Sequence, residues 1–335
     1  MQRTALKFPG PGQVCLATDS LPAPQPGELL LRTTRTLIST GTEGRIYARD
    51  FAAGTHFAHW VKYPFHPGYL HCGVVEAVGP GVTGWSPGDR AATRAPHASH
   101  VTVSADRAVP VPAAVADEEA VWLGLGRITQ IGVRAAGHQL GDTVVIAGLG
   151  LLGQLVAQYV ALAGARTILA LDPAPARLAF LAGLPTVQPF AGSAADALAA
   201  VRSANDGFRA DVAYDVTGHH AVLPTLLPLV RDAGTVVVLG DTGRPHLQTL
   251  TPDLVTRGLH LVGAHDSQAP VQSPTRGLWT GRRMEEFFLH LLTQGRMNVR
   301  PLITHRFAPA AAAEAYEMLR TSRASAMGCL FVWSD

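Results

Sequence analysis

The glycine triplet Gly148-x-Gly150-x-x-Gly153 constrains the fold of this chain more than any other feature of its sequence. It lies between the apolar run "GDTVVIAG" and the segment "LLGQLVAQYVALAGA", which has the apolar spacing of a helix. In a strand–turn–helix unit of this kind, the first glycine makes the tight turn and the second lets the backbone approach a pyrophosphate. The third lets the helix pack closely on the strand. The triplet therefore predicts a dinucleotide-binding unit.

Strand-like and helix-like segments alternate on both sides of this triplet. After the first pair, "RTILALD", "ADVAYDVTG" and "GTVVVLGD" are expected strands, and "APARLAFLAGL" and "HHAVLPTLLPLVRDAG" are expected helices. The strands are continuous apolar runs, as is typical of a sheet that is covered on both faces. The alternation predicts a doubly wound parallel sheet of the α/β class.

The first third of the chain has a different pattern. Short runs rich in Val, Leu and Thr, such as "ELLLRTTRTLIST", "CGVVEAVG" and "HVTVSAD", are separated by Gly and Pro, which predicts a β-rich domain. One helix is expected over 117–137, and a helix and a last strand, "AAAAEAYEMLR" and "GCLFVW", near the end. A chain of 335 residues suits two domains. We predict one domain from 1–122 with 271–335, and a nucleotide domain at 123–270.

Composition and charge exclude several classes of partner. The formal net charge is +2 and there is no run of Lys and Arg, so nucleic acid is not an expected partner. The longest apolar segment is interrupted by polar residues and is too short to span a bilayer. The N-terminus lacks the apolar core of a signal peptide, and the three cysteines are far apart. We expect a cytoplasmic protein with a small-molecule substrate and no membrane contact.

Asp172 ends the second expected strand, about 20 residues after the glycines, where a carboxylate accepts hydrogen bonds from the ribose hydroxyls. Its charge also repels a 2′-phosphate, which favours NAD(H) over NADP(H). Arg177 is interpreted as a solvated residue or a cover for the adenine. Ligands bind outside the carboxyl ends of such strands. The further expected cofactor contacts are Leu151, Leu152, Pro173, Thr217, Gly218, Gly240, Asp241 and His265. For Thr217, Gly218, Gly240 and Asp241, the alternative is a turn residue without contact to the cofactor.

The order of these elements resembles the medium-chain dehydrogenase/reductase superfamily. The segment "GVVEAVGPGVTGWSPGDRA", the glycine triplet with Asp172, and the terminal "LITHRF" and "AAEAY" carry the resemblance, although Ala91 replaces the usual Val. It implies a GroES-like catalytic domain, a Rossmann domain and a homodimer. Within the superfamily, "ISTGTE", "PGY" and "YDVTG" resemble the branch that contains the bacteriochlorophyllide hydroxyethyl dehydrogenase. The resemblance does not identify the substrate.

The resemblance also locates the three ligand positions of a catalytic zinc. Thr40 takes the place of the usual Cys, Tyr69 that of the His, and Leu125 that of the third ligand. The four cysteines of a structural zinc lobe, expected after "PGDR", are missing as well. We therefore expect no metal. A site rebuilt from histidines, such as His97 and His100, is the remaining alternative.

Without zinc, hydrogen-bond donors must polarise the reacting oxygen. By resemblance, Thr42 matches a hydroxyl that relays a proton, and Tyr69 points at the substrate. The alternatives are that Tyr69 fills the space of the missing metal and that Thr42 caps a helix, a role compatible with catalysis. Glu43 is expected to be structural, and Thr129 to touch the nicotinamide. The expected substrate pocket also includes Thr40, Arg45, Trp60, His66 and Leu125.

Two further segments are candidates for the pocket. The insert "HFAHWVKYPF" supplies aromatic side chains that suit a pocket wall or a flap packed on its own domain. The stretch "SQAPVQSPTRGLWTGRR" resembles neither strand nor helix, which suits a lid or a dimer contact. Its Arg276, Arg282 and Arg283 are interpreted as solvated charges, with an acidic substrate as the alternative.

Three functions are compatible with these features. The first is a zinc-independent, NAD(H)-dependent oxidoreductase acting on a secondary alcohol or ketone. The second is an NAD(P)H-dependent reductase of quinones or enones, against which Asp172 weighs. The third is a nucleotide-binding redox sensor without turnover, which the changes at the metal positions allow.

Overall fold

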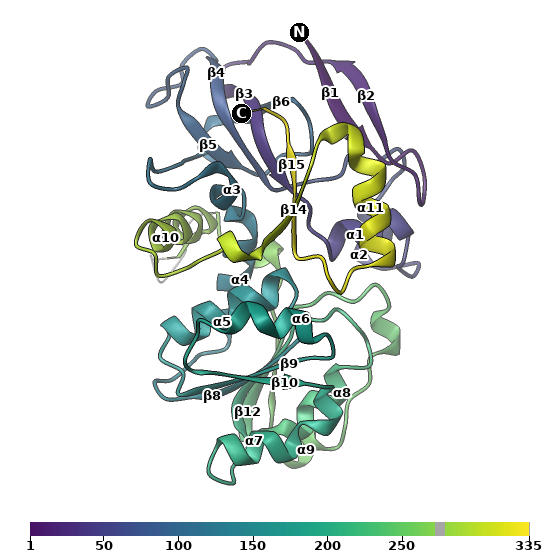
Figure 1. Ribbon diagram of the computed structural model, residues 1–335, viewed down its shortest axis with the longest axis vertical. Helices are drawn as coiled ribbons and strands as arrows, with labels where there is room; N and C mark the ends of the chain where they lie inside the picture. Colours follow the sequence, from purple (N-terminus) through teal and green to yellow (C-terminus); the bar gives the residue numbers. More distant parts are fainter. Residues whose placement is uncertain (272–278, 335) are drawn as a thin grey trace. The chain divides into compact units, whose positions relative to one another are not determined.

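The computed structural model describes residues 1–271 and 279–334 of the chain and divides into two compact units (Figure 1). Unit 1 comprises residues 1–50, 56–126 and the described part of 270–335, and unit 2 comprises 51–55 and 127–269. Arg276 and the middle of the expected lid segment lie outside the described residues. Within the described residues, no helix is long and apolar enough to cross a membrane.

Unit 1 is built on a twisted sheet in the order β14-β15-β3-β4-β5-β7, with β6 also paired to β3. The β3 strand is antiparallel to both β4 and β15, so the end of the chain returns to this sheet. A separate antiparallel pair, β1 and β2, precedes it. The strands are β1 Gln2–Lys7, β2 Cys15–Ser20, β3 Glu28–Leu37, β4 His71–Val78, β5 Arg90–Thr93, β6 His100–Ser104, β7 Val109–Pro110, β14 Ile303–Phe307 and β15 Gly328–Val332.

The sequence offered a helix start at Thr42 as an alternative and predicted helices near the end of the chain, but none at 56–60. Helices do interrupt this β-rich unit. They are α1 Thr42–Ala48 and α2 His56–Trp60, and the end of the chain adds α10 Gly281–Thr293 and α11 Ala312–Thr321. The single helix expected over 117–137 is divided into α3 Asp117–Ala120 and α4 Leu123–Ala135. The break includes Trp122, which is fully buried and in contact with Gly328.

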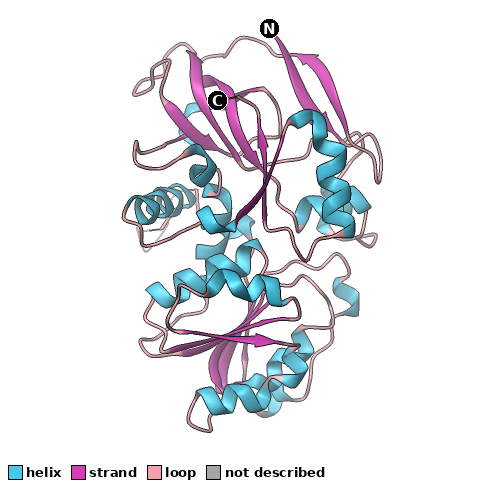
Figure 2. Ribbon diagram, viewed as in Figure 1, coloured by secondary structure: helices cyan, strands magenta, loops and turns pink. Residues whose placement is uncertain are grey.

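Unit 2 is a six-stranded parallel sheet in the order β10-β9-β8-β11-β12-β13. Helices lie on both faces of the sheet (Figure 2). This strand order is that of a doubly wound dinucleotide-binding sheet, with its switch point between β8 and β11. The predicted α/β fold class is confirmed. The elements are β8 Thr143–Ala147, α5 Leu151–Leu162, β9 Thr167–Asp172, α6 Pro175–Leu178, β10 Val187–Ala191, α7 Leu198–Ala204, β11 Ala210–Asp215, α8 Leu223–Leu226, β12 Val230–Val238, α9 Asp253–Thr256 and β13 His260–Gly263.

The helix predicted over 219–234 is wrong in its second half. The α8 helix and a 3-10 turn end at Leu229, and residues 230–234 belong to β12. Pro224 and Pro228 lack the N–H groups that a continuous helix needs. Val230 is fully buried and pairs with Ala210, so tertiary pairing decides the conformation there.

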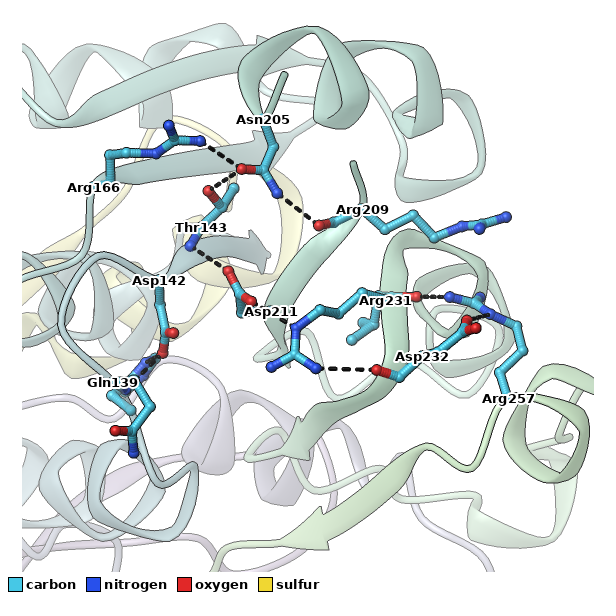
Figure 3. A network of polar contacts seen from close by, with 12 residues as sticks. Gln139, Asp142, Thr143, Arg166, Asn205, Arg209, Asp211, Arg231, Asp232 and Arg257 are labelled. Carbon is cyan, nitrogen blue, oxygen red and sulfur yellow. Dashed lines mark hydrogen bonds and ion pairs between the residues drawn. The ribbon is translucent and has the colours of Figure 1, made fainter. Parts of the chain in front are cut away.

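A polar network ties together the amino ends of the unit 2 strands (Figure 3). The Thr143 N–H donates to Asp211 Oδ2 at 2.8 Å, and Arg231 pairs with the same carboxylate at 2.7 Å. The Thr143 hydroxyl and Arg166 both donate to Asn205 Oδ1, at 2.9 Å and 2.6 Å. Each of these polar groups thus has a hydrogen-bond or ion-pair partner at the amino edge of the sheet. The carboxyl edge, where ligands bind in such sheets, carries the glycine turn instead.

Candidate active site and nucleotide site

The glycine turn at the carboxyl end of β8 is shaped by close backbone contacts. Gly148 has a φ of 93°, and a Cβ there would lie 2.8 Å from Thr217 Cγ2. A Cβ on Gly153 would lie 2.0 Å from the Gly148 carbonyl oxygen, so only glycine permits this helix–strand packing. Gly150, by contrast, has no neighbour within 4 Å of its would-be Cβ, and α5 begins at the next residue. The turn thus leaves room for a pyrophosphate beside the helix N-terminus.

The Asp172 carboxylate is buried and already makes hydrogen bonds within the protein. Its side chain is 2% exposed, and its Oδ2 accepts the Leu149 N–H at 2.8 Å. Oδ1 accepts the Ala174 N–H at 2.8 Å, and Arg177 Nη1 lies 3.5 Å from Oδ2. The carboxylate therefore braces the glycine turn while keeping its charge at the end of β9. Each carboxylate oxygen has a second lone pair with which to accept a further bond.

The other predicted cofactor residues of unit 2 fall in two groups. Most lie just beyond the carboxyl ends of the strands, where a Cβ on Gly240 would lie 2.4 Å from the Gly218 nitrogen. The loops after β11 and β12 are thus in contact. This group contains Pro173, Thr217, Gly218, Gly240, Asp241 and His265. Leu151 and Leu152 are in the first turn of α5, and Thr129 is fully buried in α4.

Unit 1 contains a cavity of about 250 Å³ with aromatic walls and a few polar groups. Four predicted residues line it, namely Thr42, Trp60, His66 and Tyr69, together with Glu43, Ile46, Phe65, Gly68 and Pro96. Three other predicted pocket residues are not in its lining. Thr40 and Leu125 are buried, and the Arg45 guanidinium lies 5.7 Å from the Phe57 ring.

Tyr69 presents a hydrogen-bonded phenol to this cavity. Its hydroxyl lies 2.6 Å from Ser39 Oγ, and the Arg94 guanidinium lies 5.0 Å from its ring centre. Burial raises the pKa of the phenol, against the smaller lowering effects of Ser39 and Arg94. The phenol is therefore a neutral hydrogen-bond donor at physiological pH. Gly68, with a φ of 97°, permits the preceding turn, because a Cβ there would lie 2.7 Å from the His97 nitrogen.

The interpretation of Thr42 as a helix cap is wrong. The capping position of α1 is Gly41, which has helical dihedrals and no side chain to accept a bond, and Thr42 is the first helical residue. Its hydroxyl instead hydrogen-bonds to Tyr69 and faces the cavity. Ser39, Thr42 and Tyr69 thus form one group of hydroxyls.

Glu43 belongs to a buried cluster next to this group, in which its carboxylate accepts three hydrogen bonds. Its side chain is 1% exposed, and its Oε1 accepts the Ser39 N–H at 2.7 Å. Oε2 accepts from His97 Nε2 at 2.9 Å and from the Tyr316 hydroxyl at 2.6 Å. Because the carboxylate can only accept, we assign the proton of His97 to Nε2. The structural role expected for Glu43 matches these contacts.

Sequence reasoning missed Ser39 and Arg94. Ser39 is adjacent to the lost ligand position at Thr40, in the quoted stretch "ISTGTE", which was the available signal. Arg94 follows β5 and reaches Tyr69 only through the fold, so no local pattern indicated it.

Comparisons with known proteins agree with this architecture. Residues 25–113 match the alcohol dehydrogenase GroES-like domain, and residues 152–272 match the zinc-binding dehydrogenase model. A 2-desacetyl-2-hydroxyethyl bacteriochlorophyllide A dehydrogenase of Cereibacter sphaeroides is 26% identical over 94% of each chain.

This chain belongs to the medium-chain dehydrogenase/reductase superfamily. It is an alcohol-dehydrogenase-like oxidoreductase of that superfamily. Solved structures show the same fold. An Escherichia coli oxidoreductase/dehydrogenase of unknown specificity, involved in membrane biogenesis, gives a TM-score of 0.85 at 17% identity, with 100% of both chains covered. A putative zinc-binding dehydrogenase from Sinorhizobium meliloti 1021, bound to NADP, gives 0.81 at 19% identity, with 99% of both covered.

The residues at the metal positions of this medium-chain dehydrogenase do not fit zinc. Thr40 and Tyr69 offer neutral hydroxyls, and Leu125 offers no donor atom, whereas zinc sites use thiolate, imidazole or carboxylate. The histidine pair His97 and His100 does not form such a site. His97 Nε2 is bonded to Glu43, while His100 Nε2 lies 3.4 Å from Glu76. Their imidazoles thus bind different carboxylates.

Replacing Glu43 by Gln should lower the free energy of unfolding by roughly 2–3 kcal/mol, because the new amide group would face buried donors. Chemical denaturation measures the change. The matched control is Glu317→Gln, whose carboxylate is 51% exposed and pairs with Arg320 on the surface. The control should leave stability almost unchanged, because surface ion pairs contribute little. Equal effects of the two variants would contradict the assigned role of Glu43.

Proposed function

We propose that this chain is a zinc-independent, NAD(H)-dependent oxidoreductase that interconverts a secondary alcohol and a ketone. The observation that carries the proposal is the Tyr69 phenol. It stands at a position where zinc relatives bind the metal, faces an aromatic-walled cavity, and is held by Ser39 at 2.6 Å. A neutral donor so placed can polarise a carbonyl oxygen in place of a Lewis acid.

The residues of unit 2 fit a nicotinamide dinucleotide. The open turn at Gly150 and the N-terminus of α5 suit its pyrophosphate, and Asp172 suits the adenosine ribose. When bound, this cofactor accepts or supplies the hydride. The charge of Asp172 favours NAD(H), because a 2′-phosphate would meet a buried carboxylate that Arg177 only partly balances.

The residues of unit 1 bind and orient the substrate in this proposal. Tyr69 and Thr42 direct hydroxyl hydrogen atoms at the reacting oxygen. Trp60 and Phe65, whose rings pack edge to face with centres 5.3 Å apart, cover the apolar part of the substrate and exclude water.

Two other functions use the same features. A reductase of quinones or enones would use the same phenol to bind the carbonyl oxygen. A redox sensor would bind the nucleotide without turnover. The hydrogen-bonded phenol favours catalysis over the sensor, since a residue that only fills space needs no polar group.

We further propose a homodimer. The β13 strand is the last of the unit 2 sheet, and its Leu261 is 39% exposed. An unpaired strand edge with an exposed apolar residue suits pairing with a second copy.

Tyr69→Phe should lower kcat about 10²-fold, the usual effect of removing one such donor, and leave the Kd for NADH unchanged. Turnover is measured over a panel of alcohols, ketones and quinones, and the Kd by fluorescence titration. Tyr47→Phe is the control, because its hydroxyl donates to the Gly12 carbonyl outside the cavity lining. Unchanged turnover in Tyr69→Phe would assign this residue to packing.

Titration with both coenzymes should give a Kd for NADH at least about tenfold below that for NADPH, a difference of about 1.4 kcal/mol. Asp172→Asn should reduce this ratio, because the variant removes the charge and keeps an acceptor for the Leu149 N–H. A preference for NADPH would contradict the proposal. Tight binding without turnover over the whole panel would favour the sensor.

Metal analysis of the purified protein should find no stoichiometric zinc, since the donor atoms at the three positions do not suit it. Treatment with EDTA should leave both turnover and thermal stability unchanged. One zinc per chain, or loss of activity on chelation, would overturn the zinc-independent mechanism.

A further inference from the structure

His66 is an unused imidazole in the wall of the unit 1 cavity. It lines the cavity with Tyr69 and Thr42, and its side chain is also exposed to solvent. Among the described residues, neither of its ring nitrogens makes a hydrogen bond. The ring thus reaches both the cavity and bulk water with its nitrogen atoms available.

The groups around His66 keep it neutral. Partial burial lowers its pKa, and Lys7 and Arg3 of β1 lower it further, while Asp19 of β2 raises it slightly. Asp19 is itself paired with both cations, at 2.7 Å to Arg3 and 3.6 Å to Lys7. At neutral pH the imidazole therefore has a free lone pair.

Alcohol oxidation needs a group that takes the hydroxyl proton, and the other polar residues of the cavity do not suit that task. The Tyr69 phenol retains its own proton because burial raises its pKa. Thr42 has a hydroxyl of very high pKa. The Glu43 carboxylate already accepts from three buried donors, on Ser39, His97 and Tyr316. Of the residues that line the cavity, His66 is the one whose ordinary pKa lies near neutrality.

We propose that His66 is the catalytic base for alcohol oxidation and the catalytic acid for ketone reduction at this site. The inference rests on the proposed function. In the oxidation, the carbinol C–H bond would break and its electron pair would leave as hydride, which a nicotinamide dinucleotide held at the Gly148–Gly153 turn would accept. The O–H proton passes to a ring nitrogen of His66, directly or through one water, as the C=O bond forms. The exposed imidazolium then returns the proton to solvent, while Tyr69 holds the oxygen throughout.

The first test measures the imidazole itself. Proton–nitrogen correlation NMR of the intact protein follows each histidine with pH, and His66→Gln assigns the signal. The expected midpoint for His66 lies below 6.5, its ordinary value. A midpoint well above neutrality would overturn the proposal, because the ring would then be cationic at physiological pH.

The second test measures the kinetics of the alcohol from the panel that has the highest kcat/KM. His66→Gln should lower kcat/KM at least about 10²-fold, a typical contribution of a general base. In the wild type, kcat/KM should fall as pH drops below the His66 midpoint, since protonation removes the base. This decrease at low pH should be absent from the pH profile of the His66→Gln variant. Imidazole added to His66→Gly should restore part of the rate. His59→Gln is the control, because His59 is exposed on α2 and outside the cavity lining.

The outcomes separate the two proposals. An active wild type with unchanged rate and pH profile in His66→Gln would overturn the role of His66 alone. A wild type inactive on every alcohol and ketone would overturn the proposed function and the role of His66 with it.

Discussion

The buried carboxylate of Glu43 holds together three segments that are distant in the sequence. Its oxygens accept from Ser39 after β3, from His97 before β6 and from Tyr316 on α11. A buried charge is stable only when its hydrogen bonds are satisfied, so each donor is fixed by the same requirement. Ser39 in turn bonds to the Tyr69 hydroxyl, and a Cβ on Gly68 would meet His97. The position of the cavity phenol therefore depends on an acid that is enclosed behind it.

In the proposed mechanism, several hydrogen bonds take the place of the metal–ligand bonds of the zinc relatives. A metal fixes substrate through its own coordination geometry, whereas a hydroxyl group rotates and must be oriented by neighbours. Here Ser39 and Thr42 orient the phenol, and Arg94 lies against its ring. Preorganisation of this kind needs a rigid surrounding structure, which the sheet of unit 1 and the Glu43 cluster provide.

The sequence predicted what depends on local pattern. The glycine triplet, the apolar strand runs and the carboxylate at Asp172 depend on short-range spacing, and the fold class followed from them. Errors arose where distant contacts decide. Val230 extends a strand instead of a helix because it pairs with Ala210. Arg94 lies against Tyr69 because β5, which precedes it, pairs with β4, which follows Tyr69. The placement of Thr42 was misjudged because glycine at the capping position is compatible with many helix starts.

Asp172 has a consequence for attempts to alter coenzyme preference. Its carboxylate accepts the backbone N–H of Leu149, within the glycine turn itself. The residue that would read the ribose therefore also shapes the loop that would hold the pyrophosphate. A substitution made to admit a 2′-phosphate would loosen that loop as well and weaken the binding of either coenzyme. The contacts expected for the ribose and for the pyrophosphate therefore depend on the same side chain. A variant that changes the ribose contact would need a second substitution that restores the glycine turn.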